Sequence, residues 1–143
     1  MDRIAVFGAL AKHSLDFAIY AWPVSLAVLA TFLAALFFRA SGRALISRRA
    51  PLISATYVFP IVVLLAGAAL RYDWNTHPSW VEPAAWRPLA VWAVVILHIA
   101  VLLLVAYSAT GARWRSTAFL LPGVWLSLSC AFVAVIAVVG VGP

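Results

Sequence analysis

Residues Leu89 to Ser108 read LAVWAVVILHIAVLLLVAYS, twenty consecutive positions without a formal charge. At about 1.5 Å per residue, a helix of this length covers roughly 30 Å, the thickness of the hydrocarbon core of a bilayer. The stretch therefore predicts a membrane-spanning helix. Its only ionisable side chain is His98, near the middle, where a polar group is costly unless it has a partner.

The composition of the whole chain favours the same class of protein. Of its 143 residues, 66% are hydrophobic and 10% are charged, and the mean hydropathy is +1.08. Soluble domains carry about 25% charged residues. The net charge of +6 comes from basic residues beside apolar segments, as the positive-inside rule predicts, so nucleic-acid binding is not expected. Cys130 is the only cysteine, which excludes an intrachain disulfide and a cysteine-based metal cluster.

Three further apolar segments predict an all-α integral membrane protein with four transmembrane helices in a bundle. The expected spans are about residues 17–38, 52–70, 89–108 and 117–139, preceded by an N-terminal interfacial segment at residues 1–16. Pro60 lies near the middle of the second span and cannot donate to the carbonyl of Thr56, so a kink is expected there.

The two halves of the chain also show a faint similarity. Residues 40–43 read ASGR and residues 109–113 read ATGAR. Two related helical hairpins would leave such a trace, and similar membrane-flanking composition produces it as well.

The distribution of arginines predicts the orientation of the chain. The connection between the first two spans contains Arg39, Arg43, Arg48 and Arg49 and no acidic residue, and residues 109–116 contain two more arginines and no acid. Because cytoplasmic loops are enriched in basic residues, both connections are expected inside and both termini outside, in a membrane of the bacterial inner-membrane type. The four arginines of the first connection are also candidates for binding anionic lipid headgroups.

Two other groups of residues are expected to fix the helices in the bilayer. Tryptophans at the expected membrane surfaces, which would serve as interfacial anchors, are Trp22, Trp74, Trp80 and Trp86. Small residues repeat at four-residue spacing and predict close helix contacts. They form two stripes, one of Ala27, Thr31 and Ala35 and the other of Gly123, Ser127 and Ala131.

The sequence contains no motif for catalysis or metal binding. The central parts of the spans hold no Asp, Glu, Lys or Arg, which an autonomous ion pump would need. No serine, histidine and carboxylate stand at a spacing typical of hydrolases, and the His-Glu pairs of zinc proteases are absent. We therefore expect no catalytic activity from the chain on its own.

His98 is open to two hypotheses. In the first it forms an interhelical hydrogen bond with Ser127, Ser129 or a freed backbone carbonyl. In the second it is the ligand of a haem or chlorin, or a contact of a quinone, because a neutral imidazole can bind the metal of such cofactors. His13 and His77 are expected at other depths, so a second axial ligand would have to come from another chain.

The sequence as a whole favours a non-catalytic accessory or structural subunit of a larger integral membrane complex, with the bilayer and other integral membrane subunits as its partners. The length and four-span plan resemble small subunits of respiratory, photosynthetic and transport complexes, which is an analogy of fold alone. One alternative is a cofactor-holding subunit that uses His98. Another is a small membrane subunit of a multicomponent transporter, for which Pro60 and Pro122 are the only support.

Overall fold

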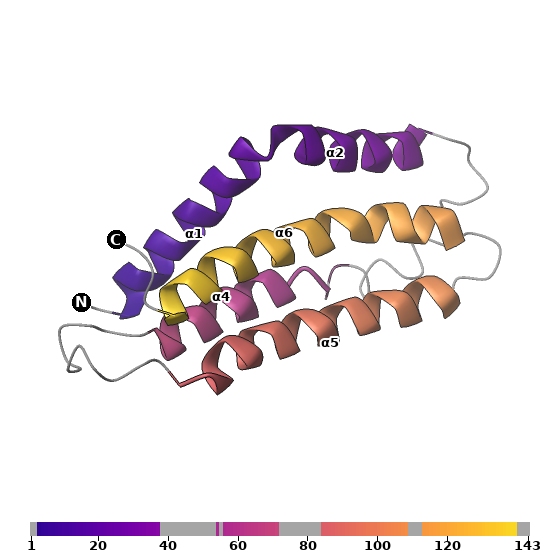
Figure 1. The fold of residues 1–143 in the computed structure, drawn as a ribbon. Helices are drawn as coiled ribbons and strands as arrows, with labels where there is room; N and C mark the ends of the chain where they lie inside the picture. Colours follow the sequence, from indigo (N-terminus) through magenta and orange to yellow (C-terminus); the bar gives the residue numbers. More distant parts are fainter. Residues whose placement is uncertain (1–2, 38–53, 55, 72–83, 109–112, 140–143) are drawn as a thin grey trace.

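The computed structural model describes residues 3–37, 54, 56–71, 84–108 and 113–139. Within these ranges the chain forms helices and no strand (Figure 1). The helices are α1 (Arg3–Tyr20), α2 (Trp22–Phe37), α4 (Phe59–Leu70), α5 (Trp86–Ser108) and α6 (Arg113–Val139). Two stretches of 23 residues, Trp86–Ser108 and Thr117–Val139, are long and apolar enough to cross a membrane. The described part of the protein is thus all-α, with two helices suited to a bilayer.

The expected continuous helix over residues 17–38 is interrupted at Ala21. Helices α1 and α2 meet there at an angle of 86°. Because Pro23 has no N–H, a helix continuing from α1 would lose the hydrogen bond to the carbonyl of Ile19. As the second residue of α2, Pro23 costs no such bond, since the first N–H groups of a helix have no acceptor within it. The first helix therefore extends beyond the expected interfacial segment and ends at Tyr20.

The break is held against α6 by two consecutive hydrogen bonds. The hydroxyl of Ser25 donates to the carbonyl of Ala18 at 2.6 Å. In an uninterrupted helix that carbonyl would accept from the N–H of Trp22. The indole Nε1–H of Trp125 in turn donates to Ser25 Oγ at 3.0 Å. One serine thus satisfies a carbonyl freed by the break and ties it to the longest helix.

Pro60 is the second residue of α4 and follows a break in the helical residues at Tyr57 and Val58, and the kink expected there stays a prediction. Helix α4 begins at Phe59, so Pro60 falls in its first turn, where its missing N–H removes no helical hydrogen bond. A turn precedes it, closed by the N–H of Tyr57 donating to the carbonyl of Ser54 at 3.1 Å. With 12 residues, α4 is about 18 Å long, which is shorter than the hydrocarbon core of a bilayer.

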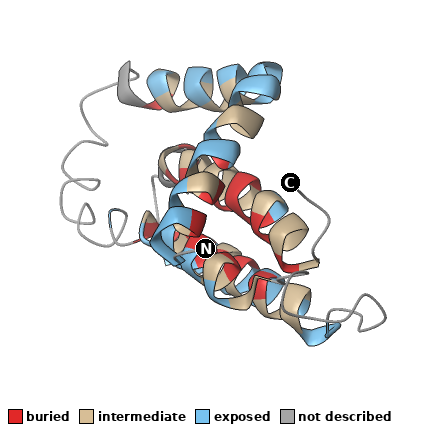
Figure 2. Ribbon diagram, turned by 90° about the vertical axis from the view of Figure 1, so that its left-hand side faces the viewer, coloured by how far each residue is buried: buried red, intermediate tan, exposed pale blue. Residues whose placement is uncertain are grey.

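Successive helices run back and forth along the bundle (Figure 1). Helix α1 begins, α4 ends, α5 begins and α6 ends at one end of the molecule, and α2 ends, α5 ends and α6 begins at the opposite end, whereas the bend between α1 and α2 and the start of α4 lie between the two ends. Helix α6 contacts each of the other four helices and forms the centre of the bundle. Buried residues line the facing sides of α4, α5 and α6, whereas α2 is mostly exposed or intermediate (Figure 2).

The contact between α4 and α6 is built on small residues. A Cβ added at Gly67 would lie 2.6 Å from the Cβ of Ala134 and 3.1 Å from its Cα. Only glycine allows two helix backbones to approach this closely. The side chain of Leu10 covers the same point, with its Cδ1 at 3.4 Å from the added Cβ. Helices α1, α4 and α6 therefore meet at Gly67.

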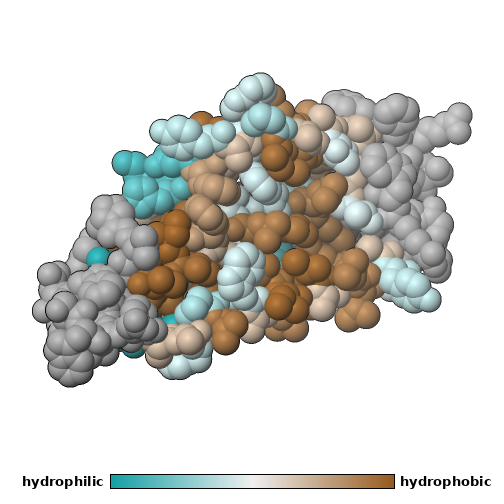
Figure 3. Space-filling model, in the orientation of Figure 1, coloured by the Kyte–Doolittle hydropathy of each residue, from teal (hydrophilic) through white to brown (hydrophobic). Residues whose placement is uncertain are grey.

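The outer surface is largely apolar. Large hydrophobic side chains are exposed on all five described helices, among them Leu15, Leu29, Leu65, Leu104 and Phe132. Figure 3 shows one such face, hydrophobic over most of its described area, with a hydrophilic patch over α1. An apolar surface of this extent is unfavourable in water and suits a membrane or other subunits.

Candidate functional site: the buried His98 cluster

His98 is the largest side chain that is completely buried in the described part of the protein. It projects from the middle of α5 toward α6, where its Nδ1 lies 2.7 Å from the Oγ of Ser127. The two residues come from neighbouring helices and are 29 positions apart in the sequence. Of the three kinds of partner that the sequence offered, the structure thus pairs His98 with Ser127. A hydrogen bond of this kind between membrane helices contributes about 0.6 kcal/mol on average and at most about 1.7 kcal/mol.

The side chain of Phe59, from α4, covers one face of the imidazole ring of His98. The ring of Phe59 is stacked on that of His98, with centroids 4.5 Å apart and planes inclined by only 2°. Phe59 is the first residue of α4 and Pro60 the second. Because proline favours the first turn of a helix, Pro60 sets where α4 begins and thereby where Phe59 lies. The stacked pair makes His98 a junction of α4, α5 and α6.

The Cε1–Nε2 edge of the imidazole faces Gly123, one turn of α6 before Ser127. A Cβ added at Gly123 would lie 3.8 Å from His98 Cε1 and 3.9 Å from Nε2, at ordinary contact distance. The ring of Tyr57 flanks the same position, with its Cε1 also at 3.8 Å. Tyr57 is fixed by its hydroxyl, which donates to the carbonyl of Phe119 at 2.9 Å. Glycine therefore leaves room for the imidazole and the phenol side by side on α6.

The second ring nitrogen of His98 has no protein partner. Nε2 is buried and lacks a hydrogen bond. The contact with Ser127 is compatible with either neutral tautomer, because the serine hydroxyl can donate to Nδ1 or accept from it. In one tautomer Nε2 is an unpaired acceptor and in the other an unpaired donor. Either way the cluster carries one unsatisfied polar atom, which costs free energy in an apolar interior.

This geometry suits a structural role of His98 better than ligation of a large cofactor. A haem or chlorin ligated by an imidazole nitrogen needs open space in front of that nitrogen. His98 is 0% exposed, and its unpaired Nε2 is enclosed between α4, α5 and α6. The residues present therefore do not fit a macrocycle at this position without separation of the helices.

The small-residue stripes differ in where they lie. Gly123, Ser127 and Ala131 are all buried on the side of α6 that faces α4 and α5. On α2, by contrast, Ala27 is exposed and Thr31 half-buried, and Ala35 alone of that stripe is buried. The Thr31 hydroxyl donates to the carbonyl of Ala27 within its own helix at 2.8 Å. The α2 stripe is thus not in continuous contact with another described helix.

Several predicted residues lie apart from the cluster or outside the described ranges. Trp22 and Trp86 are 61% and 56% exposed, at the beginnings of α2 and α5. His13 is on the outer side of α1 and lies 3.9 Å from the carboxylate of Asp16. The residues outside the described ranges are His77, Trp74, Trp80, Arg39, Arg43, Arg48 and Arg49.

Four residues that shape the bundle were not singled out from the sequence: Ser25, Phe59, Gly67 and Trp125. Gly67 is followed by two alanines, and this run of small residues in α4 was the signal available for a close helix contact. Nothing in the sequence indicated that Trp125 would reach Ser25, since 100 positions separate them.

The described residues contain no group of three or more His, Cys, Asp or Glu side chains that could hold a metal ion. No protein-family model, curated protein or solved structure matches the chain. Any functional conclusion therefore depends on the His98 cluster and on the surface of the bundle.

Proposed function

We propose that the chain is a non-catalytic accessory or structural subunit of a larger integral membrane complex. The observation that carries this proposal is the enclosure of His98, the one ionisable side chain in the middle of α5. Its Nδ1 pairs with Ser127 and its ring stacks on Phe59, so its interactions hold α4, α5 and α6 together. A polar group used in this way contributes to helix association and needs no substrate.

The proposal includes four membrane crossings. The four proposed crossings are the bent pair α1 and α2, the segment that ends in α4, then α5 and α6, of which α5 and α6 lie side by side along the length of the bundle (Figure 1). If these four segments cross in turn, the two segments that carry arginines and no acidic residue, residues 39–50 and 109–116, belong to the same side of the membrane, as the positive-inside rule requires. We place that side in the cytoplasm and both termini outside, in an inner membrane of the bacterial type.

A second candidate function is supported by the unpaired Nε2 of His98. A subunit that holds a haem or chlorin, or contacts a quinone, would use this nitrogen as ligand or hydrogen-bonding group. It would require α4 to separate from α5 and α6, because the nitrogen is enclosed. The third candidate is a small subunit of a multicomponent transporter, for which Pro60 and Pro122 are the only support.

The substitution His98→Leu tests the proposal. Under the structural role, leucine fills the site, removes the unpaired Nε2 and loses one interhelical hydrogen bond. We expect a change in unfolding free energy of about 1 kcal/mol or less and normal co-purification of partner subunits in mild detergent.

Ser127→Ala is the matched control, since it removes the same hydrogen bond and leaves the imidazole in place without a partner. It should destabilise the bundle more than His98→Leu does, because both ring nitrogens are then unpaired. Loss of a visible absorption band or of a quinone-linked activity in His98→Leu alone would instead support the cofactor-holding subunit.

A further inference from the structure

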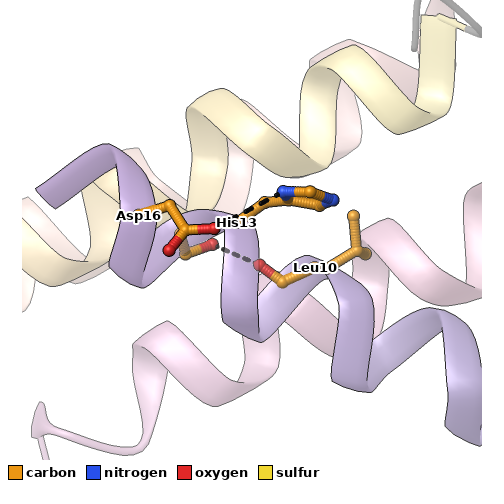
Figure 4. Close-up of polar contacts among 4 residues, drawn as sticks. Leu10, His13 and Asp16 are labelled. Atoms are coloured by element: carbon orange, nitrogen blue, oxygen red, sulfur yellow. Dashed lines mark hydrogen bonds and ion pairs between the residues drawn. The ribbon is translucent and has the colours of Figure 1, made fainter. Parts of the chain in front are cut away.

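The outer side of α1 carries three ionisable side chains, Lys12, His13 and Asp16. Figure 4 shows His13 and Asp16 side by side on this helix, 3.9 Å apart, with side chains that are 53% and 44% exposed. Lys12 is exposed as well and lies four residues before Asp16, on the same face. Figure 3 shows a hydrophilic patch over α1, the helix that carries them.

The contacts of Phe17 show which part of α6 lies level with Lys12, His13 and Asp16. Phe17 follows Asp16 directly, and its ring stacks on Phe132 at 4.6 Å and lies 6.3 Å from the ring of Trp125. The apolar stretch of α6, Thr117–Val139, has its midpoint between these two partners. Asp16 is therefore level with the middle of α6, and Lys12 is about 6 Å further along α1.

This position conflicts with exposure to lipid. If α6 crosses the bilayer, as the proposed function requires, Lys12 and Asp16 lie within the hydrocarbon core, whose half-thickness is about 15 Å. Charged side chains at such depths are found facing protein or water and paired with one another. The apolar residues of α1, such as Val6 and Leu10, already face α4 and α6, so rotation of the helix cannot hide the charges.

We propose that this face of α1 is the contact between two copies of the chain. The surface offers one positive and one negative charge four residues apart, so it is complementary to itself. In a two-fold dimer the same face is used by both copies, and a contact from Lys12 of one copy to Asp16 of the other would occur twice. The axial offset of about 6 Å is within reach of a lysine side chain, as it is for the charged flanking positions of coiled coils.

The neighbouring turns of α1 suit a close helix approach. Ala5, Gly8 and Ala9 precede Lys12 on the same side of the helix at three- and four-residue spacing. A Cβ added at Gly8 would meet nothing within 4 Å, so no contact within the chain requires glycine there. Glycine within a helix is less favourable than alanine by about 1 kcal/mol. A close contact with a second helix would explain glycine at this position, since small residues let two helices approach.

Charge reversal tests the dimer. In a mild detergent, the full chain should be dimeric by light scattering. Lys12→Asp places two negative charges on the face and Asp16→Lys places two positive ones. Each variant alone should dimerise at least about tenfold more weakly, because like charges then oppose one another. A mixture of the two variants, carrying different affinity tags, should form a heterodimer. Ala100→Leu on the exposed side of α5 is the control and should leave dimerisation unchanged.

The possible failures are distinguishable. Wild-type chain that stays monomeric, single variants that dimerise like the wild type, or a mixture that forms no heterodimer would each overturn the dimer and leave the proposed function intact. If alkaline carbonate extracts the chain from membranes, the membrane crossing by α6 is wrong, and both the proposed function and the dimer are overturned.

Discussion

Replacing Gly67 by alanine should destabilise the bundle, although alanine is the better helix former. The added Cβ would lie 2.6 Å from the Cβ of Ala134, and ordinary contact begins at 3.4 Å, so the separation must grow by about 0.8 Å. Neither atom belongs to a flexible side chain, so α4 and α6 must move apart. Overpacking costs about 1–3 kcal/mol and the helix preference of alanine returns about 1 kcal/mol. We expect a net loss of about 1 kcal/mol and no more than about 2 kcal/mol.

The loss can be measured as a change in unfolding free energy in mixed micelles, with helix content followed by circular dichroism. Gly123→Ala is the matched control, because its Cβ would meet its neighbours at 3.8–3.9 Å and should be neutral or slightly stabilising. Adding Ala134→Gly to Gly67→Ala removes the opposing Cβ and should recover part of the stability, as a coupled pair does. If Gly67→Ala is as stable as Gly123→Ala, the close approach of α4 and α6 is refuted.

Two other predictions concern the bend and the orientation. Ser25→Ala should destabilise the chain by about 1–3 kcal/mol, since it leaves a carbonyl and an indole N–H unpaired. Trp125→Phe should cost less, because the serine keeps its carbonyl; equal losses in the same unfolding assay would contradict this relay. For orientation, single cysteines introduced at Ser47 and Ser79 in a Cys130→Ala background should react with a membrane-impermeant thiol reagent from the outside only at position 79. Outside labelling at position 47 would reverse the assignment.

The sequence alone predicts an apolar helical protein, because the length and the polarity of a segment are properties of that segment and do not depend on the rest of the fold. Residues Leu89–Ser108 exclude charge over the length of a bilayer core, and the structure has α5 over Trp86–Ser108. His98 was recognisable because one imidazole in an apolar segment needs a partner, whatever the fold around it. The hydroxyl of Ser127 was one of a few groups available to it, and it is the partner in the structure.

The break at Ala21 was not predictable from local pattern. A proline in the first turn of a helix and a proline that follows the end of a helix look the same in the sequence. Pro23 is the second residue of α2, and it also follows closely on the end of α1 at Tyr20. The break is stabilised because the Ser25 hydroxyl donates to the freed carbonyl of Ala18 and accepts a hydrogen bond from the indole N–H of Trp125. Such a contact depends on α6 lying beside the bend.

The sequence by itself determined that this chain is helical and apolar and that His98 is an ionisable side chain within an apolar segment, because hydropathy, charge and helix period belong to each segment separately. Only the tertiary structure decided that Phe59 covers the imidazole, that Gly67 meets Ala134, and that the charges of α1 stand level with the middle of α6. Each of these contacts depends on how far one helix is shifted along its axis relative to its neighbour. A periodic pattern tells which side of a helix is buried, but the offset is set by how side chains on two helices interdigitate, which no single segment contains.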